Sequence, residues 1–249
     1  PSLVFKALRL IAKGAFKNTL RTSSAVIAPT EYTKRDLVDF AQIDASKIHV
    51  TLEAADQVSA IPEPYPLPFT NFLLYVGNFY AYKNVATLID AHSRLCVSNP
   101  DLGLVLAGRL HPPGAELRAR VRSAGHKNVV FTDFVSDSHR EWLYRNCLAY
   151  VFPSISEGFG LPGIEAMRAG APVLSSTATC LPEVFRDGAA YFDPRSVESL
   201  HKQLDWVLKD ETGVADLRKR GRRVADSYSW ETMARQTLDV YRKVSGSGK

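Results

Sequence analysis

Two carboxylates and a run of glycines stand out in the second half of the chain. In the segment SEGFGLPGIEA, Glu157 and Glu165 are eight residues apart, with three glycines between them. Gly158 and Gly160 allow backbone conformations that other residues avoid, and they let backbone N–H groups approach a ligand closely. A helix that starts near Leu161 would aim its free N–H groups and positive dipole end at that ligand. The segment therefore predicts an anion site of the kind that holds phosphates.

Charged side chains near this turn could contact the groups that the phosphates carry. Glu165 lies one turn into the predicted helix, where its carboxylate can accept two hydrogen bonds from the vicinal hydroxyls of a ribose. Glu157 precedes the turn and is expected on the other side of the phosphates. Lys83, at the start of an earlier helix, is a mobile cation that can reach the same phosphates. Together they favour a nucleoside diphosphate with a hydroxyl-rich group attached.

Each of these residues also has a plainer explanation. Glycine-rich turns between a strand and a helix are common, and Glu165 could serve only the helix dipole. Lys83 could be a solvated lysine and Glu157 an exposed loop acid. The combination of two glutamates at this spacing around GFGLPG nevertheless favours a functional site.

The pattern of apolar segments predicts how these residues meet. Apolar strands are expected at residues 72–78, 102–108, 128–134, 148–154 and 171–176, with helices between them. Apolar strands joined by helices indicate a parallel sheet covered on both faces, which is an α/β fold of the Rossmann-like, doubly wound type. Such sheets bind ligands beyond the carboxyl ends of their strands. Asn84 is the expected N-cap of the first of these helices.

Composition excludes several classes of protein. The net charge of +5 over 249 residues is too small to indicate nucleic acid as a partner. The sequence contains no apolar run of about 18 residues, so no membrane span is expected. Cys96, Cys147 and Cys180 lack the spacing of metal ligands and suit a reducing compartment, so a cytoplasmic location is expected.

The N-terminal segment is basic and amphipathic. Five cations precede the first acidic residue, Glu31: Lys6, Arg9, Lys13, Lys17 and Arg21. Apolar residues recur among these cations at helical spacing. Such a helix could lie on anionic lipid as a peripheral contact at the inner face of the membrane. The favoured alternative is a helix packed on its own domain with its basic face in water.

At these motifs the sequence resembles glycosyltransferase family 4, the retaining enzymes of GT-B fold, over about residues 20 to 244. PSISEGFGLPGIEAMRAGAPVLSS is similar to the E-x7-E segment of that family, with Glu157 and Glu165 as its glutamates. YVGNFYAYKNVATLIDAHSRL is similar to the first strand and helix of its donor domain. LPEVFRDGAAYFDP is similar to the segment after the next strand.

The resemblance implies a role for individual residues at the strand ends. Glu165 would bind the donor ribose, Glu157 a hydroxyl of the transferred sugar, and Lys83 the diphosphate as it leaves. Backbone amides facing the diphosphate and sugar would come from Gly158, Phe159, Gly160 and Leu161. Phe134 would place its backbone against the base.

One position departs from the family pattern. Many members carry an arginine just after the first donor-domain strand, where this chain has Asn78. Lys83 would then act with Arg109 or alone. The catalytic residues expected from the resemblance are Lys83 and Glu157, with no metal and no other cofactor.

The resemblance also implies a domain organisation and an activity. Residues 1–60 would be the last part of an N-terminal acceptor domain plus a linker, with most of that domain missing. Residues 61–228 would form the nucleotide-sugar donor domain, and residues 229–249 a C-terminal helix that packs back on the N-terminal domain. The chain would be a truncated form, a proteolytic product or one half of a split enzyme. The intact enzyme would transfer a sugar from a GDP- or UDP-sugar, with GDP-mannose favoured, to a glycan or lipid-linked acceptor.

Two other functions remain open from the sequence. A non-catalytic module on the same fold could bind a nucleotide or nucleotide sugar without chemistry. A sugar nucleotide epimerase or a phosphorylase could also use this fold, although the sequence has no evident lysine site for the pyridoxal phosphate that a phosphorylase needs.

Overall fold

The computed structural model describes residues 3–56 and 60–246, with the side chain of Leu3 excepted, and it divides into two compact units. Unit 1 comprises Pro1–Glu53 and Ser229–Lys249, and unit 2 comprises Ala54–Tyr228. The first boundary thus follows Glu53 rather than residue 60, and the second follows Tyr228.

Unit 2 is built on a parallel sheet of six strands. These are β3 (Phe72–Val76), β4 (Gly103–Ala107), β5 (Val129–Asp133), β6 (Ala149–Phe152), β7 (Val173–Ser176) and β8 (Ala189–Phe192). Their order is β5-β4-β3-β6-β7-β8 and every pairing is parallel. The chain changes direction across the sheet between β3 and β6, the kind of switch point at which doubly wound sheets bind ligands. The predicted fold class is confirmed.

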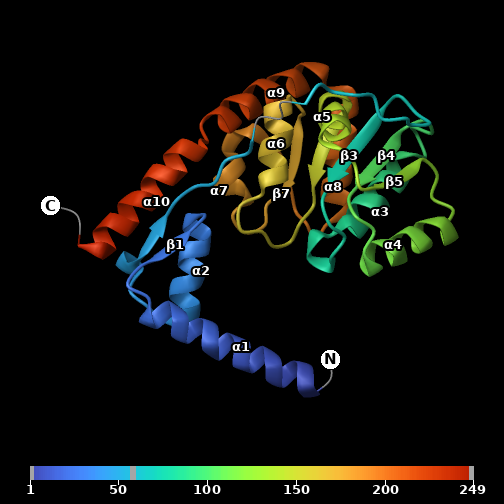
Figure 1. The fold of residues 1–249 in the computed structure, drawn as a ribbon. Coiled ribbons are helices and arrows are strands. Elements are labelled where there is room, and N and C mark those ends of the chain that lie inside the picture. The colour runs from blue at the N-terminus through green and yellow to red at the C-terminus, as the bar shows by residue number, and fades with distance from the viewer. Residues whose placement is uncertain (1–2, 57–59, 247–249) are drawn as a thin grey trace. The chain divides into compact units, whose positions relative to one another are not determined.

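Helices cover both faces of this sheet (Figure 1). They are η2 (Ala81–Lys83), α3 (Val85–Leu95), α4 (Pro112–Ser123), α5 (Asp137–Asn146), α6 (Leu161–Ala169), α7 (Leu181–Phe185), η3 (Arg186–Gly188), α8 (Val197–Lys209) and α9 (Glu211–Asp226). On one face, Leu73 and Tyr75 belong to an apolar cluster with residues of α3, α4 and α8. On the other face, Phe72 stacks on Trp142 of α5, with ring centroids 6.1 Å apart. Alternate residues of β3 therefore serve opposite layers.

Asn84 precedes α3 as predicted, but its side chain does not cap the helix. Its backbone is left-handed (φ 56°), and no side-chain capping bond forms. Instead, Asn84 Nδ2 donates to the carbonyls of Pro153 and Pro194, at 3.1 and 2.8 Å. The capping bond predicted for this side chain is absent, because Asn84 Oδ1, the atom that would accept it, accepts a hydrogen bond from the Thr87 hydroxyl at 2.7 Å instead.

Unit 1 contains α1 (Leu3–Thr22), β1 (Val26–Ala28), α2 (Glu31–Ala41), η1 (Ala45–Lys47), β2 (Ile48–Val50) and α10 (Trp230–Ser245). Strands β1 and β2 pair in parallel.

Helix α1 packs on its unit only near its C-terminal end. The Phe16 ring lies 5.9 Å from that of Phe40, and Leu20 is buried. Val4 and Leu8, in the first half of the helix, are exposed among the described residues. The packing of this helix on its own domain, the favoured alternative from the sequence, is therefore seen only in its second half.

Helix α6 approaches α7 so closely that Gly163 has no room for a side chain. A Cβ at Gly163 would lie 2.2 Å from Cζ of Phe185, which is fully buried. We expect Gly163→Ala to lower the free energy of unfolding by about 1–2 kcal/mol, because overpacking exceeds the gain in helix propensity. Urea unfolding measures this loss.

The control for this substitution is Phe185→Leu, alone and combined with Gly163→Ala. The double variant should lose less stability than the sum of the single variants, because the smaller side chain accommodates the new methyl group. Strictly additive losses would contradict a steric contact between these two positions.

Candidate functional site

An ion pair joins Lys83 and Glu157 at the carboxyl edge of the sheet. Lys83 Nζ lies 2.6 Å from Glu157 Oε1, and the two side chains are only 11% and 12% exposed. Lys83 ends η2 after β3, and Glu157 lies in the loop after β6, so the pair spans the switch point. The ammonium group also lies 5.2 Å from the ring centroid of Tyr82 and 5.6 Å from that of Phe152. These rings exclude water and strengthen the electrostatic interaction.

The segment between β7 and α7 holds the backbone of Glu157. The Glu157 N–H donates to Oγ1 of Thr179 at 3.0 Å, and the Cys180 thiol donates to the Glu157 carbonyl at 3.2 Å. Burial raises the pKa of Cys180 to about 12, so this thiol remains a donor. Thr179 has φ 50°, which is strained for a β-branched residue. Its hydrogen bond helps to compensate for that strain and fixes the start of the glycine turn.

The glycine turn leads into α6 as the sequence predicted. Gly160, at the N-cap position, has φ 108°, and Pro162 occupies the first helical turn after Leu161. The side chain of Phe159 is buried and meets the ring of Tyr228 edge-on at 5.5 Å. Phe159 thus anchors the turn through its ring, and Gly158 is exposed at its tip. The positive end of the α6 dipole thus begins four residues after Glu157 in the sequence.

Glu165, one turn into α6, is held by two residues of α5. Tyr144 Oη donates to Glu165 Oε2 at 3.1 Å, and Arg140 Nε lies 3.8 Å from the same oxygen. Burial, followed by the charge of Glu165, raises the pKa of Tyr144 well above its usual value, so the hydroxyl stays protonated. Both partners were missed from the sequence, although their spacing of four residues places them on one face of a helix.

The remaining predicted residues have other partners. The Arg109 guanidinium, after β4, lies 5.6 Å from the ring centroid of Phe134, which follows β5 and is exposed. Asn78 accepts hydrogen bonds from Tyr75 Oη through its carbonyl and, at 3.3 Å, from the Tyr80 N–H through its side chain. The structure therefore pairs Lys83 with Glu157 rather than with Arg109, and Asn78 shapes the turn before η2.

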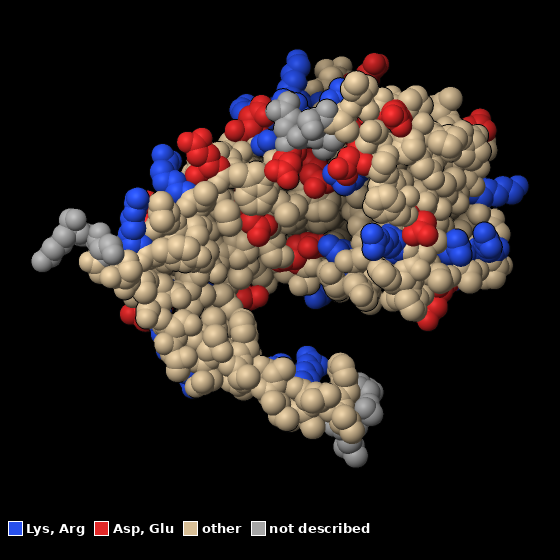
Figure 2. Space-filling view, in the orientation of Figure 1, with Lys and Arg blue, Asp and Glu red and all other residues tan. Residues whose placement is uncertain are grey.

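Several other kinds of site are not found in the part of the chain that the structure describes. No group of three or more histidine, cysteine or acidic side chains could hold a metal ion there. None of the helices at residues 3–56 and 60–246 combines the length and apolarity that a membrane crossing requires. On the described surface visible in Figure 2, basic and acidic side chains are interspersed rather than gathered into one basic area.

Several solved structures share this fold. Sucrose-phosphate synthase from Thermosynechococcus elongatus is 23% identical, with a TM-score of 0.81 over 95% of this chain and 62% of that one. Anabaena HepE, solved with UDP and glucose, is 18% identical, with a TM-score of 0.75 over 90% of this chain and 64% of that one. At these identities the likeness concerns the fold.

Curated relatives share more of the sequence. The serotype-specific mannosyltransferase WbdA of Escherichia coli is 33% identical over 215 residues, which are 85% of this chain and 25% of that protein. An MMP alpha-(1->4)-mannosyltransferase of Mycolicibacterium hassiacum is 35% identical over 213 residues, covering 83% of this chain and 51% of the relative. The chain thus spans about a quarter to a half of the length of these relatives. Residues 62–224 match the family described as glycosyl transferases group 1. The chain belongs to this family of glycosyltransferases.

Proposed function

We propose that this chain is the donor-binding part of a retaining glycosyltransferase of family 4. The enzyme transfers mannose from GDP-mannose to an acceptor hydroxyl during glycan or polysaccharide synthesis. The observation that carries this proposal is the Lys83–Glu157 ion pair beside the N-terminus of α6, with Glu165 one turn further along.

The diphosphate of the donor binds between Lys83 and the start of α6. A diphosphate carries more negative charge than a carboxylate, so it competes with Glu157 for the ammonium group. The backbone amides of the turn from Gly158 to Leu161 add donors and the positive end of the helix dipole. These groups stabilise the charge that develops on the leaving phosphate, and the reaction needs no metal ion.

The transferred sugar lies on the Glu157 side of the diphosphate. Once Lys83 turns to the phosphate, the Glu157 carboxylate accepts a hydrogen bond from a sugar hydroxyl. The acceptor oxygen attacks the anomeric carbon from the face that the diphosphate leaves, and the departing phosphate takes the acceptor proton. Configuration is retained without a covalent sugar–enzyme intermediate.

The nucleoside lies toward α5. Glu165 accepts hydrogen bonds from the ribose hydroxyls, and the backbone near Phe134 borders the base, with Arg109 beside it. Tyr144 and Arg140 hold the Glu165 carboxylate in place from behind. This geometry supports one oriented carboxylate for the ribose and a second, Glu157, for the sugar.

The mannosyl specificity and the biological context are supported by the names of the relatives. WbdA and the O-antigen chain mannosyltransferase B of Escherichia coli are both named mannosyltransferases. The acceptor proposed here is a glycan or lipid-linked glycan, and the enzyme works in the cytoplasm, with a peripheral contact to the inner face of the membrane through α1. In the longer protein, residues 1–53 belong to the acceptor-binding domain.

Of the two substitutions in the ion pair, only that of the lysine should weaken nucleoside diphosphate binding. Lys83→Ala removes one charge-assisted contact of about 1.5–3 kcal/mol, so we expect roughly 10- to 150-fold weaker binding of GDP. Glu157→Gln removes the competitor for Lys83, so GDP binding should be equal or tighter. In the longer protein both variants should lower the transfer rate. Calorimetric titration that gave unchanged GDP affinity in Lys83→Ala would contradict the phosphate role.

The Tyr144 hydroxyl should matter only through the ribose. Tyr144→Phe leaves the ring in place but frees the Glu165 carboxylate, so GDP should bind about 3- to 10-fold more weakly. The affinity for 2′,3′-dideoxy-GDP should stay unchanged, because that ligand has no hydroxyls for Glu165. Glu165→Gln is the matched variant and should likewise reduce the preference for GDP over 2′,3′-dideoxy-GDP. Equal weakening for both nucleotides would argue against ribose recognition by this carboxylate.

The nucleobase can be tested with this chain alone. Titration with GDP, UDP and ADP in the presence of EDTA should give the tightest binding for GDP. The chelator should leave that affinity unchanged, because Lys83 and the helix end neutralise the diphosphate. Tight UDP binding without GDP binding would overturn the guanine assignment, and loss of binding on chelation would overturn the metal-free one.

A further inference from the structure

We propose that the side chains of Tyr80 and Tyr82, together with a groove between α3 and α4, bind the sugar chain that accepts the transferred sugar. This inference rests on the proposed function and adds an acceptor subsite to it. Four features support it: an exposed aromatic pair, the hydrogen-bonded backbone of that pair, the shape of the groove and its place on the sheet.

The two tyrosines form a stacked and exposed pair. Their ring centroids lie 6.2 Å apart and their planes differ by 11°. Tyr80 is 50% exposed and Tyr82 is 39% exposed. The face of an aromatic ring carries partial negative charge, and the C–H groups on the flat side of a pyranose carry partial positive charge. An exposed tyrosine pair therefore offers a surface on which sugar rings stack.

The backbone around this pair is fixed by hydrogen bonds. The Lys83 N–H donates to the Tyr80 carbonyl at 2.9 Å, and the Ile155 N–H donates to the Tyr82 carbonyl at 2.8 Å. A surface that is ordered before binding avoids the entropic cost of ordering it in the complex. The Tyr82 ring also lies 5.2 Å from Lys83 Nζ, so the pair begins next to the proposed site of transfer.

Exposed apolar side chains in unit 2 concentrate at this edge of the sheet. Within the described part of unit 2, the large exposed hydrophobic residues are Ile61, Tyr80, Tyr82, Val97, Phe134 and Ile155. Four of these six follow the carboxyl ends of β3, β5 or β6. Gathering of exposed apolar side chains is typical of a ligand surface.

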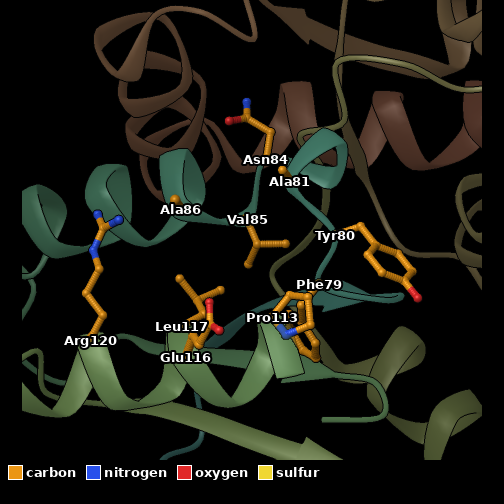
Figure 3. A pocket seen from close by; sticks show the side chains of 10 residues that line it. All are labelled: Phe79, Tyr80, Ala81, Asn84, Val85, Ala86, Pro113, Glu116, Leu117 and Arg120. Carbon is orange, nitrogen blue, oxygen red and sulfur yellow. The ribbon is translucent and has the colours of Figure 1, made fainter. Parts of the chain in front are cut away.

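A groove of about 350 Å³ continues from Tyr80 along the two helices (Figure 3). Its floor is apolar and includes Phe79, Val85 and Leu117, while Glu116 and Arg120 of α4 add polar groups. A carboxylate accepts hydrogen bonds from sugar hydroxyls and a guanidinium donates them. The volume is in the range of small-molecule sites. An apolar floor with such polar groups suits a short run of sugar rings.

The groove lies on the opposite face of the sheet from the proposed ribose contacts. Helices α3 and α4 pack on the face that carries Leu73 and Tyr75, whereas α5 packs on the face of Phe72. Glu165 is held by Tyr144 and Arg140 of α5. The nucleoside is thus assigned to the α5 side, and the α3–α4 side is left to the other substrate.

The test measures the binding of an α-linked mannotriose to this chain by saturation-transfer NMR. The affinity for GDP is measured in parallel by calorimetric titration. We expect the unaltered chain to bind the trisaccharide and Tyr80→Ala to bind it roughly 5-fold more weakly, with GDP affinity unchanged. Ala86→Trp fills the groove from α3 and should abolish trisaccharide binding. Tyr241→Ala, which removes an exposed tyrosine in unit 1, is the matched control and should bind normally.

Three results would overturn the subsite. The first is that the unaltered chain does not bind the trisaccharide. The second is that Tyr80→Ala and Ala86→Trp bind it as tightly as the unaltered chain does. The third is that Tyr80→Ala loses affinity for GDP. The last result would assign the tyrosines to the nucleotide instead. Failure of the proposed donor site gives a different pattern, in which no nucleoside diphosphate binds while trisaccharide binding still depends on Tyr80.

Discussion

The change of direction between β3 and β6 is the constraint on which the rest of unit 2 depends. Neighbouring strands that are not consecutive in the chain send their following loops apart, so a gap opens at their carboxyl ends. The loop after β3 supplies Lys83 and the loop after β6 supplies Glu157. Residues 74 positions apart thereby form one ion pair, and the helix that follows β6 begins four residues after Glu157.

The two glutamates share a motif but have different environments. Glu157 forms a 2.6 Å ion pair with Lys83 and is almost buried, whereas Glu165 accepts a hydrogen bond from the neutral Tyr144 hydroxyl, lies 3.8 Å from the Arg140 guanidinium and remains partly exposed. A carboxylate already neutralised by a lysine exchanges its partner when an anionic ligand arrives. One that is oriented by a buried tyrosine keeps its position and can accept hydrogen bonds at once. These differences suit the separate roles proposed for the sugar and the ribose.

Sheet packing also separates the two proposed substrates. Each strand alternates between faces, so β3 contributes Phe72 to the layer of α5 and Leu73 to the layer of α3 and α4. The carboxylate assigned to the ribose lies with α5, and the tyrosine-lined groove lies with α3 and α4. The ion pair stands at the edge between the two layers, where a group transferred from one ligand to the other would pass.

Local residue patterns were sufficient to predict the parallel sheet, the glycine turn, the start of α6 near Leu161 and the candidate residues at the strand ends. These features follow from apolar runs, glycine conformation and helix termini, which neighbouring residues largely determine. Only the tertiary structure revealed that Lys83 pairs with Glu157, that Thr179 and Cys180 hold the turn, and that Tyr144 and Arg140 orient Glu165. It also showed that the side-chain amide nitrogen of Asn84 donates to two carbonyls that are distant in the sequence. Such contacts depend on which loops become neighbours, and the order of strands in the sheet decides that.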